Sequence, residues 1–241
     1  MYAWFYDGDG MKLMNEFGKR FNVYSLVAGG TGCQMGGWFR KEIKEVADLK
    51  GLKFRIAGFA GKTIQKLGGI PQQIAPGDIY PALERGTIDA VEYIGPYDDE
   101  KLGFSKVAKY YYYPGWWEGA ATGHLMINLD KWNELPKRYQ SIIAGAAAYA
   151  NNEMLAKEDA RNPAALRRLL AGGTELRAFS QPIMEACLKA SNEVNAETAA
   201  ANADFKKVLE SMQAFRDDEY FWWQVAEYSY DTFMIRSRSR A

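Results

Sequence analysis

The chain has 241 residues, with 30 basic and 30 acidic side chains and a pI near 6.6. This balance gives no electrostatic reason to expect nucleic acid or an anionic membrane surface as a partner. Hydrophobic residues make up 48% of the chain, which is enough for a folded core and excludes a disordered chain.

Hydrophobic periodicity predicts strands and helices along the whole chain. The expected strands cover residues 23–27, 52–57, 70–74, 88–94, 110–118 (with its turn), 120–128 and 175–179. The expected helices cover residues 11–21, 61–67, 79–85, 136–161 and 162–171, then most of the chain from 181 onward. We expect Asp78 to cap the helix at 79–85. Strands and helices alternate between residues 52 and 94, which predicts a parallel sheet with right-handed crossovers and the α/β class.

Arg55 is placed to bind a ligand. Along the expected strand, Leu52, Phe54 and Ile56 share one face, while Lys53 and Arg55 share the other. In open α/β sheets, ligands bind at the carboxyl ends of strands, where Arg55 lies. A guanidinium there can bind a carboxylate through two parallel hydrogen bonds. The alternative is an ordinary surface arginine.

Three further oxygen-bearing residues lie in loops or near strand ends. Gln34 lies in a glycine-rich loop, Glu92 near the end of the strand at 88–94, and Glu118 after two tryptophans. Two carboxylates beside one small anion repel it unless a cation lies between them. Oxygen ligands favour Na⁺, Ca²⁺ or Mg²⁺ over zinc or copper. If these residues converge near Arg55, they predict a metal-bridged organic acid; otherwise Glu92 and Glu118 are unrelated surface carboxylates.

The remaining motifs give little support to an enzyme. The glycine-rich loop at 29–37 fits neither a dinucleotide fingerprint nor a P-loop. His124 lies inside an apolar strand, which indicates a structural residue rather than a base, and there is no Gly-x-Ser-x-Gly elbow. Cys33 and Cys187 have no metal-binding spacing and are weak evidence for a disulfide. The charge run 98–101 is expected to begin a helix on a solvated face.

Two features of the chain bear on location. No apolar run approaches the roughly 18 residues of a membrane span. The start has no basic segment followed by an apolar run, so it does not read as a signal peptide. We therefore expect either a cytoplasmic protein or a missing N-terminus.

Several segments resemble the substrate-binding subunits of tripartite ATP-independent periplasmic (TRAP) transporters, over essentially the whole chain. These segments are Gln34–Glu42, Asp48–Arg55, Gly77–Glu84 and Glu92–Lys101, and the run Gly115–Gly119 makes the likeness specific. The branch that the chain resembles most binds 2-oxo acids. The resemblance implies a two-lobed periplasmic binding protein-like α/β fold with long C-terminal helices, in which the arginine matching Arg55 clamps a carboxylate.

The resemblance also implies a site. In that branch sodium or calcium bridges ligand and protein, and its ligands would match Gln34, Glu92, the Tyr93 backbone carbonyl and Glu118. Arg55, Gln34, Glu92 and Tyr93 would contact the substrate. Tyr93 stands where a tryptophan is expected, so the pocket wall would differ. Cys33 stands where a small residue is expected and would be a buried free thiol.

The resemblance further implies an organisation. Lobe I would keep residues 1–32 and 120–160, lobe II would comprise 33–119 and 161–190, and 191–241 would form a C-terminal helical segment that exchanges between two subunits. The signal peptide and the N-terminal part of lobe I that family members carry would be missing, which implies a truncated periplasmic protein.

We therefore expect a periplasmic binding protein, not an enzyme. It would capture a small 2-oxo or 2-hydroxy monocarboxylate such as pyruvate, with Na⁺ or Ca²⁺, for a sodium-driven TRAP membrane permease. Two alternatives remain open. One is a metal-dependent enzyme that uses Glu92 or Glu118 as a base, and the other is a ligand-sensing module for a signalling receptor.

Overall fold

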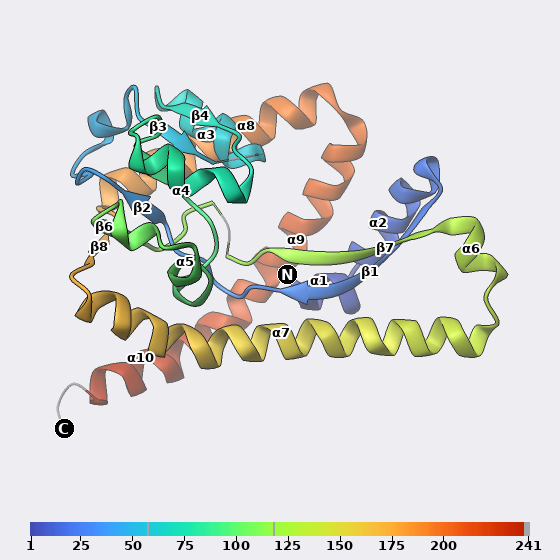
Figure 1. Cartoon of the computed structure of the whole chain (residues 1–241). Helices are drawn as coiled ribbons and strands as arrows, with labels where there is room; N and C mark the ends of the chain where they lie inside the picture. Colours follow the sequence, from blue (N-terminus) through green and yellow to red (C-terminus); the bar gives the residue numbers. More distant parts are fainter. Residues whose placement is uncertain (57, 118, 239–241) are drawn as a thin grey trace. The chain divides into compact units, whose positions relative to one another are not determined.

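The computed structural model describes residues 1–56, 58–117 and 119–238. The chain divides into two compact units. Unit 1 contains Met1–Ser25, Met126–Leu135 and the chain from Thr198 onward, and unit 2 contains Leu26–Leu125 and Pro136–Glu197. Figure 1 labels the helices and strands. Within the described ranges, no helix is both long enough and apolar enough to cross a membrane.

Unit 2 is built on a six-stranded sheet with the strand order β4-β3-β5-β2-β6-β8. The strands are β2 (Gly37–Phe39), β3 (Lys53–Arg55), β4 (Ile70–Gln72), β5 (Ala90–Val91), β6 (Tyr110–Tyr113) and β8 (Glu175–Ala178). Strand β3 is parallel to both β4 and β5, which confirms the parallel unit expected from the strand–helix alternation. The sheet as a whole is mixed, because β2 pairs antiparallel with β5 and β6.

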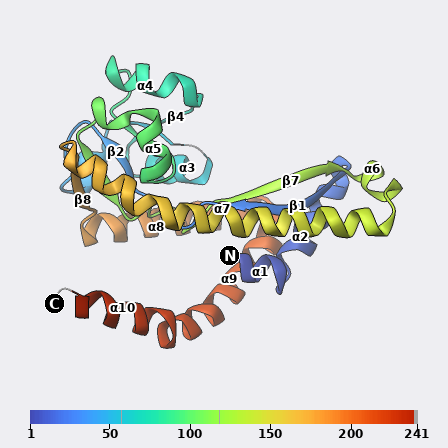
Figure 2. The same ribbon diagram turned by 60° about the horizontal axis from the view of Figure 1, so that its bottom comes forward.

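Helices from both units have the following bounds. Unit 2 contains α3 (Gly58–Lys66), α4 (Pro76–Glu84), α5 (Pro96–Leu102), α7 (Lys137–Ala171), most of α8 (Gln181–Ala201) and the short helices η2 (Val46–Leu49) and η3 (Phe104–Lys106). Unit 1 contains α1 (Tyr2–Tyr6), α2 (Gly10–Gly18), η1 (Lys19–Phe21), α6 (Leu129–Glu134), α9 (Ala203–Val225) and α10 (Glu227–Arg238). Two long strands, β1 (Val23–Gly30) and β7 (Thr122–Asn128), form a separate two-stranded sheet (Figures 1 and 2).

Two apolar clusters cover the six-stranded sheet, because successive strand residues point to opposite faces. One cluster joins Phe39, Phe54 and Tyr112 to Ile64 of α3 and to Ile183 of α8. The other contains the alternate residues Trp38, Val91 and Tyr111, packed against α4 and Leu169 of α7. Helices therefore cover both faces, and Leu52, Phe54 and Ile56 are all buried as the alternation predicted.

Helix α7 is longer than expected. The sequence predicted two helices meeting at Asn162–Pro163, but α7 is continuous from Lys137 to Ala171 with Pro163 inside it. Tertiary contacts hold the helix together here: the Asn162 side chain accepts a hydrogen bond from the Tyr97 backbone N–H at 2.9 Å. Arg168 also forms a bidentate ion pair with Glu100 of α5, with N–O distances of 2.8 and 2.6 Å. These contacts join α7 to α5 on either side of Pro163.

Two smaller expectations are wrong. Helix α4 begins at Pro76, so Asp78 lies in its first turn rather than at the cap. Proline is favoured at a first helical position because its missing N–H has no partner there. Cys33 is exposed and not buried. Its neighbour Gln34 is buried instead, and both Cys33 and Cys187 are free thiols.

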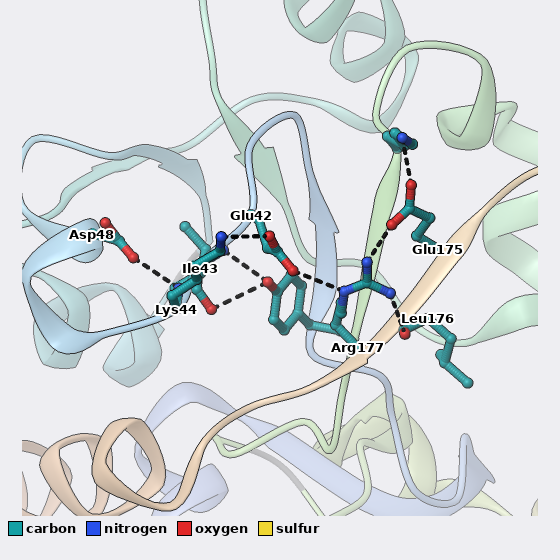
Figure 3. A network of polar contacts seen from close by, with 9 residues as sticks. Glu42, Ile43, Lys44, Asp48, Glu175, Leu176 and Arg177 are labelled. Atoms are coloured by element: carbon teal, nitrogen blue, oxygen red, sulfur yellow. Dashed lines mark hydrogen bonds and ion pairs between the residues drawn. The ribbon is translucent and has the colours of Figure 1, made fainter.

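The edge strand β8 carries an exposed network of charged groups (Figure 3). Arg177 donates to the Glu42 carboxylate at 2.9 Å and also pairs with Glu175. Tyr112 of β6 accepts from the Ile43 backbone N–H at 2.7 Å and donates to the Ile43 carbonyl at 3.1 Å. These contacts fasten the segment after β2 to the β6–β8 edge of the sheet.

In unit 1, α1 and α2 lie beside the first part of α9 (Figure 2). The Trp4 indole donates to Ser211 at 3.2 Å, and Lys207 pairs with Glu16 at 2.8 Å. The rest of α9, together with α10, carries an exposed aromatic surface. Its members are Tyr220, Phe221, Trp222, Trp223, Tyr228, Tyr230 and Phe233.

Candidate functional site

Arg55 is the last residue of β3, and its side chain is largely buried. Its Nη1 donates to the Glu92 carbonyl at 2.7 Å and to the Glu92 carboxylate at 2.9 Å. Its Nε donates to the Ile74 carbonyl at 3.4 Å, and its Cζ lies 5.7 Å from the Tyr93 ring centroid. A guanidinium held by several acceptors is fixed in orientation. Arg55 is therefore not a solvated surface arginine.

Glu92 meets Arg55 because β3 and β5 are parallel neighbours. Arg55 is paired with Val91 in the ladder, and the Glu92 N–H donates to the Arg55 carbonyl at 3.1 Å. The two strands therefore end together, as ligand-bearing strand ends do in α/β sheets. The Glu92 side chain is buried against Arg55, so the pair is shielded from water.

Gln34 reaches the same end of the sheet through its loop. Gly37 has a φ of +100°, and a Cβ there would lie 2.4 Å from the Val91 carbonyl oxygen. Only glycine permits this close approach to the end of β5. One residue beyond Gln34, the Met35 N–H donates to the Ile94 carbonyl at 2.9 Å. The loops that carry Gln34 and Glu92 are thus joined by a backbone hydrogen bond.

The Gln34 side chain is buried and oriented. Its Nε2 donates to Thr31 Oγ1 at 3.1 Å, which directs the amide oxygen away from Thr31. Thr31 Oγ1 also accepts from the Ala121 N–H at 3.0 Å. Thr31 was not singled out from the sequence, because its role depends on a contact with a segment about ninety residues away.

The Glu118 segment also comes to this loop. The Gly115 N–H donates to the Gln34 carbonyl at 3.0 Å, and the Trp117 ring lies 6.1 Å from that of Phe54 on β3. Glu118 itself, expected as a metal ligand, lies outside the described residues. The structure therefore brings Arg55, Glu92 and Tyr93 together and fastens the Gln34 loop beside them.

Sequence reasoning missed two buried carboxylates, Glu158 on α7 and, close to the site, Asp99 on α5. It was expected on a solvated face as part of the charge run 98–101, and that expectation is wrong for Asp99. Its carboxylate accepts from Trp38 Nε1 at 3.0 Å, from the Tyr111 hydroxyl at 2.7 Å and from the Ile94 N–H at 3.2 Å. Burial raises the pKa of Asp99 to about 6, against the hydrogen bonds, which lower it. A usable signal was helical spacing, since Asp99 follows the buried Pro96 by three residues.

Among the described residues, no three His, Cys, Asp or Glu side chains lie close enough together to hold a metal ion. The ligand set implied by the resemblance is different, because it uses an amide oxygen and a backbone carbonyl as well as carboxylates. His124 on β7 is half-buried, and burial lowers its pKa. This keeps the imidazole neutral around pH 7.

The sequence profile of the DctP family, described as bacterial extracellular solute-binding protein, family 7, matches residues 1–202. The chain belongs to this family. This confirms the family identified from the segments around Gln34, Arg55 and Glu92. Family members are solute-binding proteins of transport systems, and the α/β fold with its mixed sheet agrees with that of solved TRAP solute-binding proteins.

Three relatives are informative. The chain is 51% identical over 237 residues to the monocarboxylate 2-oxoacid-binding periplasmic protein of Nostoc sp.. The matched region covers 98% of this chain and 65% of the relative. A TRAP transporter solute-binding protein of Bordetella bronchiseptica superposes with a TM-score of 0.96 at 49% identity, over 99% of this chain and 71% of that one. That structure is a mixed-occupancy dimer with copurified calcium and picolinate in one site.

The third relative is a TRAP periplasmic solute-binding protein of Pseudoalteromonas atlantica, with bound sodium and pyruvate. It superposes with a TM-score of 0.90 at 42% identity, over 95% of this chain and 70% of that one. The chain thus spans about two thirds of the length of each of these proteins. Calcium accompanies picolinate in the Bordetella structure, and sodium accompanies pyruvate in the Pseudoalteromonas structure.

Proposed function

We propose that this protein binds a small 2-oxo or 2-hydroxy monocarboxylate such as pyruvate, together with Na⁺ or Ca²⁺, for uptake through a sodium-driven TRAP membrane permease. The observation that carries the proposal is the largely buried guanidinium of Arg55 at the carboxyl end of β3. Such a group can hold a carboxylate through two parallel hydrogen bonds. The bound ligands of the Bordetella and Pseudoalteromonas proteins support this ligand class.

Charge balance supports the cation. Arg55 and Glu92 already neutralise each other at 2.9 Å. An incoming carboxylate would therefore add an uncompensated negative charge to a largely buried site, which is costly. Na⁺ bound beside Glu92 restores neutrality, and Ca²⁺ does so when Glu118 also binds it. Arg55 is then available to the ligand carboxylate.

The donor set fits a hard cation. The Gln34 amide oxygen, the Glu92 carboxylate and the Tyr93 carbonyl are all oxygen donors, as Na⁺ and Ca²⁺ prefer. The Met35–Ile94 hydrogen bond holds the two loops that carry them at one strand end. These residues, with Glu118, would hold the cation. When bound, the cation supplies positive charge to the oxygens of the ligand.

We infer that the site performs no chemistry and that the protein works in the periplasm. The Arg55 guanidinium contacts the Glu92 carboxylate and the Glu92 and Ile74 carbonyls, and the Gln34 amide contacts the Thr31 hydroxyl. A clamp needs only complementary charge and shape, and these residues supply both. The extracellular character of the family supports the location.

We also propose a homodimer through the C-terminal helices. The aromatic surface on α9 and α10 exposes rings such as Phe221 and Phe233, which are 78% and 66% exposed. Exposed apolar faces of this kind mark interaction surfaces. The dimer of the Bordetella protein supports a second copy as the partner.

Calorimetric titration of the purified protein with pyruvate, in calcium, in sodium, or in potassium with a chelator, tests the function. Methyl pyruvate is the matched control, because it keeps the 2-oxo group but lacks the carboxylate. We expect pyruvate to bind in calcium or sodium and methyl pyruvate not to bind. Equal binding of the two would refute the carboxylate clamp. Loss of pyruvate from the mixture, followed by NMR, would favour the enzyme instead.

A further inference from the structure

Asp99 is a buried carboxylate, only 1% exposed, that the proposed binding site does not contain. One of its oxygens accepts from the Ile94 N–H, and the other accepts from both the Trp38 indole and the Tyr111 hydroxyl. The donors come from β2, from β6 and from the loop after β5. Asp99 therefore ties α5 to two central strands and to the loop that carries Glu92 and Tyr93.

The hydrogen bonds continue from Asp99 into the proposed site. Ile94, whose N–H is bound by Asp99, accepts at its carbonyl from the Met35 N–H at 2.9 Å. The adjacent Gln34 carbonyl accepts from the Gly115 N–H at 3.0 Å. One side-chain hydrogen bond and two backbone hydrogen bonds thus link this buried carboxylate to the loops of Glu92 with Tyr93, of Gln34 and of Gly115.

We propose that Asp99 is a positioning residue, which fixes the three ligand-bearing loops relative to one another in the cation-free protein. The inference rests on the proposed function for its effect on binding. Its effect on the loops themselves does not depend on any ligand.

The chemistry of the three donors explains why a carboxylate is needed. Both oxygens of an ionised Asp accept hydrogen bonds, whereas Asn offers one acceptor oxygen and one donating NH₂ group. With Asn at position 99, the NH₂ group would face either the Ile94 N–H or the two donors from Trp38 and Tyr111. Burial penalises the ionised acid and raises its pKa to about 6. A carboxylate kept at such a cost is more useful for orienting donors than for stability.

The test compares Asp99→Asn with Glu100→Gln, a matched change of the next carboxylate on α5, which pairs with Arg168 at the surface. Amide hydrogen exchange is measured without cation. For Asp99→Asn we expect exchange at Ile94, Met35 and Gly115 to accelerate by about tenfold or more, because one lost hydrogen bond loosens the next. Glu100→Gln should leave these three amides unchanged. Unchanged exchange in Asp99→Asn would overturn the proposal.

Binding supplies the second readout. Calcium affinity, measured by calorimetry, should fall about tenfold or more in Asp99→Asn, as expected for a residue that orients metal ligands. Pyruvate affinity should recover when calcium is saturating, because the cation then draws the loops together. A defect that calcium does not reverse would indicate general structural damage and would contradict the positioning role.

The two hypotheses fail in different ways. If the unmodified protein binds pyruvate in neither calcium nor sodium, the proposed function is wrong, and the exchange measurement still decides the role of Asp99. If Asp99→Asn does not fold, Tyr111→Phe replaces it. That variant removes one donor and keeps the charge, so it should accelerate exchange at Ile94 and Met35 about twofold to fivefold. No acceleration in Tyr111→Phe would then overturn the proposal.

Discussion

Unit 2 contains two arginine–glutamate pairs of the same length in different surroundings. Arg55 pairs with Glu92 and Arg177 pairs with Glu42, each at 2.9 Å. The side chains of the first pair are 16% and 11% exposed, and those of the second are 37% and 30% exposed. The first lies where two central strands end, and the second lies on the edge strand β8.

Equal N–O distances thus occur in a largely buried pair and in a more exposed pair, and the two pairs differ in how far water reaches them. Water and salt screen an exposed pair, so its net contribution to stability is small. A largely buried pair keeps most of its interaction and leaves a costly unpaired charge when one partner is removed. Such a charge is available to a ligand that replaces the partner, which is what we infer for Arg55.

The largest expected effect is on carboxylate binding. Arg55→Lys keeps the charge but loses the planar fork of the guanidinium. Breaking a buried charge pair costs about 2–5 kcal/mol, and the lower end corresponds to about 30-fold, so pyruvate affinity should fall at least about 30-fold. Arg177→Lys is the matched control and should change affinity less than about twofold. Calorimetry with calcium present measures both. Equal effects of the two substitutions would remove the distinction between the buried and exposed pairs.

The next effect concerns pH and the buried Asp99. Its pKa is raised to about 6, so the folded state holds this proton more tightly than the unfolded state does. Stability is therefore greatest at low pH for this group and is lost as pH rises from about 4 to about 6. The loss is about 3 kcal/mol, from two pKa units at about 1.4 kcal/mol each. Asp98 on the same helix and Tyr111 on β6 face this carboxylate, and the Asp98 charge adds to the shift.

Urea unfolding at pH 4 and pH 7 measures this effect. As pH rises, the unmodified protein should lose about 3 kcal/mol of unfolding free energy relative to Asp99→Asn, because the variant lacks the titrating carboxyl group. Glu100→Gln is the control on the same helix, because Arg168 lowers the Glu100 pKa, the direction opposite to the shift at Asp99. If the unfolding free energies of the unmodified protein and Asp99→Asn change in parallel with pH, the pKa of Asp99 does not differ between the folded and unfolded states.

A smaller effect is expected on the cation. Glu92→Gln keeps the shape of the side chain but removes a charged ligand, so calcium affinity should fall about tenfold, equivalent to about 1.4 kcal/mol. Glu42→Gln removes the corresponding charge from the exposed pair and should leave calcium affinity unchanged. A calcium titration of both variants decides the point. If Glu92→Gln binds calcium like the unmodified protein, Glu92 is not a ligand.

The smallest effect is expected at the exposed pair itself. Arg177→Gln breaks the contacts to Glu42 and Glu175, yet both carboxylates remain hydrated afterward. The melting temperature should therefore shift by less than about 2 °C, and raising the salt concentration should reduce the shift further. A larger shift that salt does not reduce would show that the β6–β8 edge depends on this network.

Local patterns predicted much of this fold. The alternation of Leu52, Phe54 and Ile56 with Lys53 and Arg55 is a property of one strand, and the structure agrees with it. The parallel pairing of β3 with β4 and β5 followed from the strand–helix alternation. The strand pattern was accessible because its cause lies within a few residues, and the parallel pairing was accessible because a strand–helix–strand order returns the second strand parallel to the first.

Features set by distant contacts were not accessible. The hydrogen-bond donors to the buried Asp99 carboxylate come from two other elements, Trp38 on β2, which is 61 residues away in sequence, and Tyr111 on β6. Helix α7 continues through Pro163, and the neighbouring Asn162 side chain accepts from the Tyr97 backbone N–H of α5, 65 residues away in sequence. The loops of Gln34 and Glu92 are joined by the backbone hydrogen bond from Met35 to Ile94, and a pattern of side chains does not predict such a bond. The residue types at the site could thus be named from sequence, but their supporting contacts could not.

A crystal structure of the protein grown with pyruvate and calcium tests the central claim most directly. We predict that the Arg55 guanidinium turns from the Glu92 carboxylate to the pyruvate carboxylate, with two parallel hydrogen bonds, while calcium binds Gln34, Glu92 and the Tyr93 carbonyl. A structure in which Arg55 stays on Glu92 and pyruvate binds elsewhere would contradict the account.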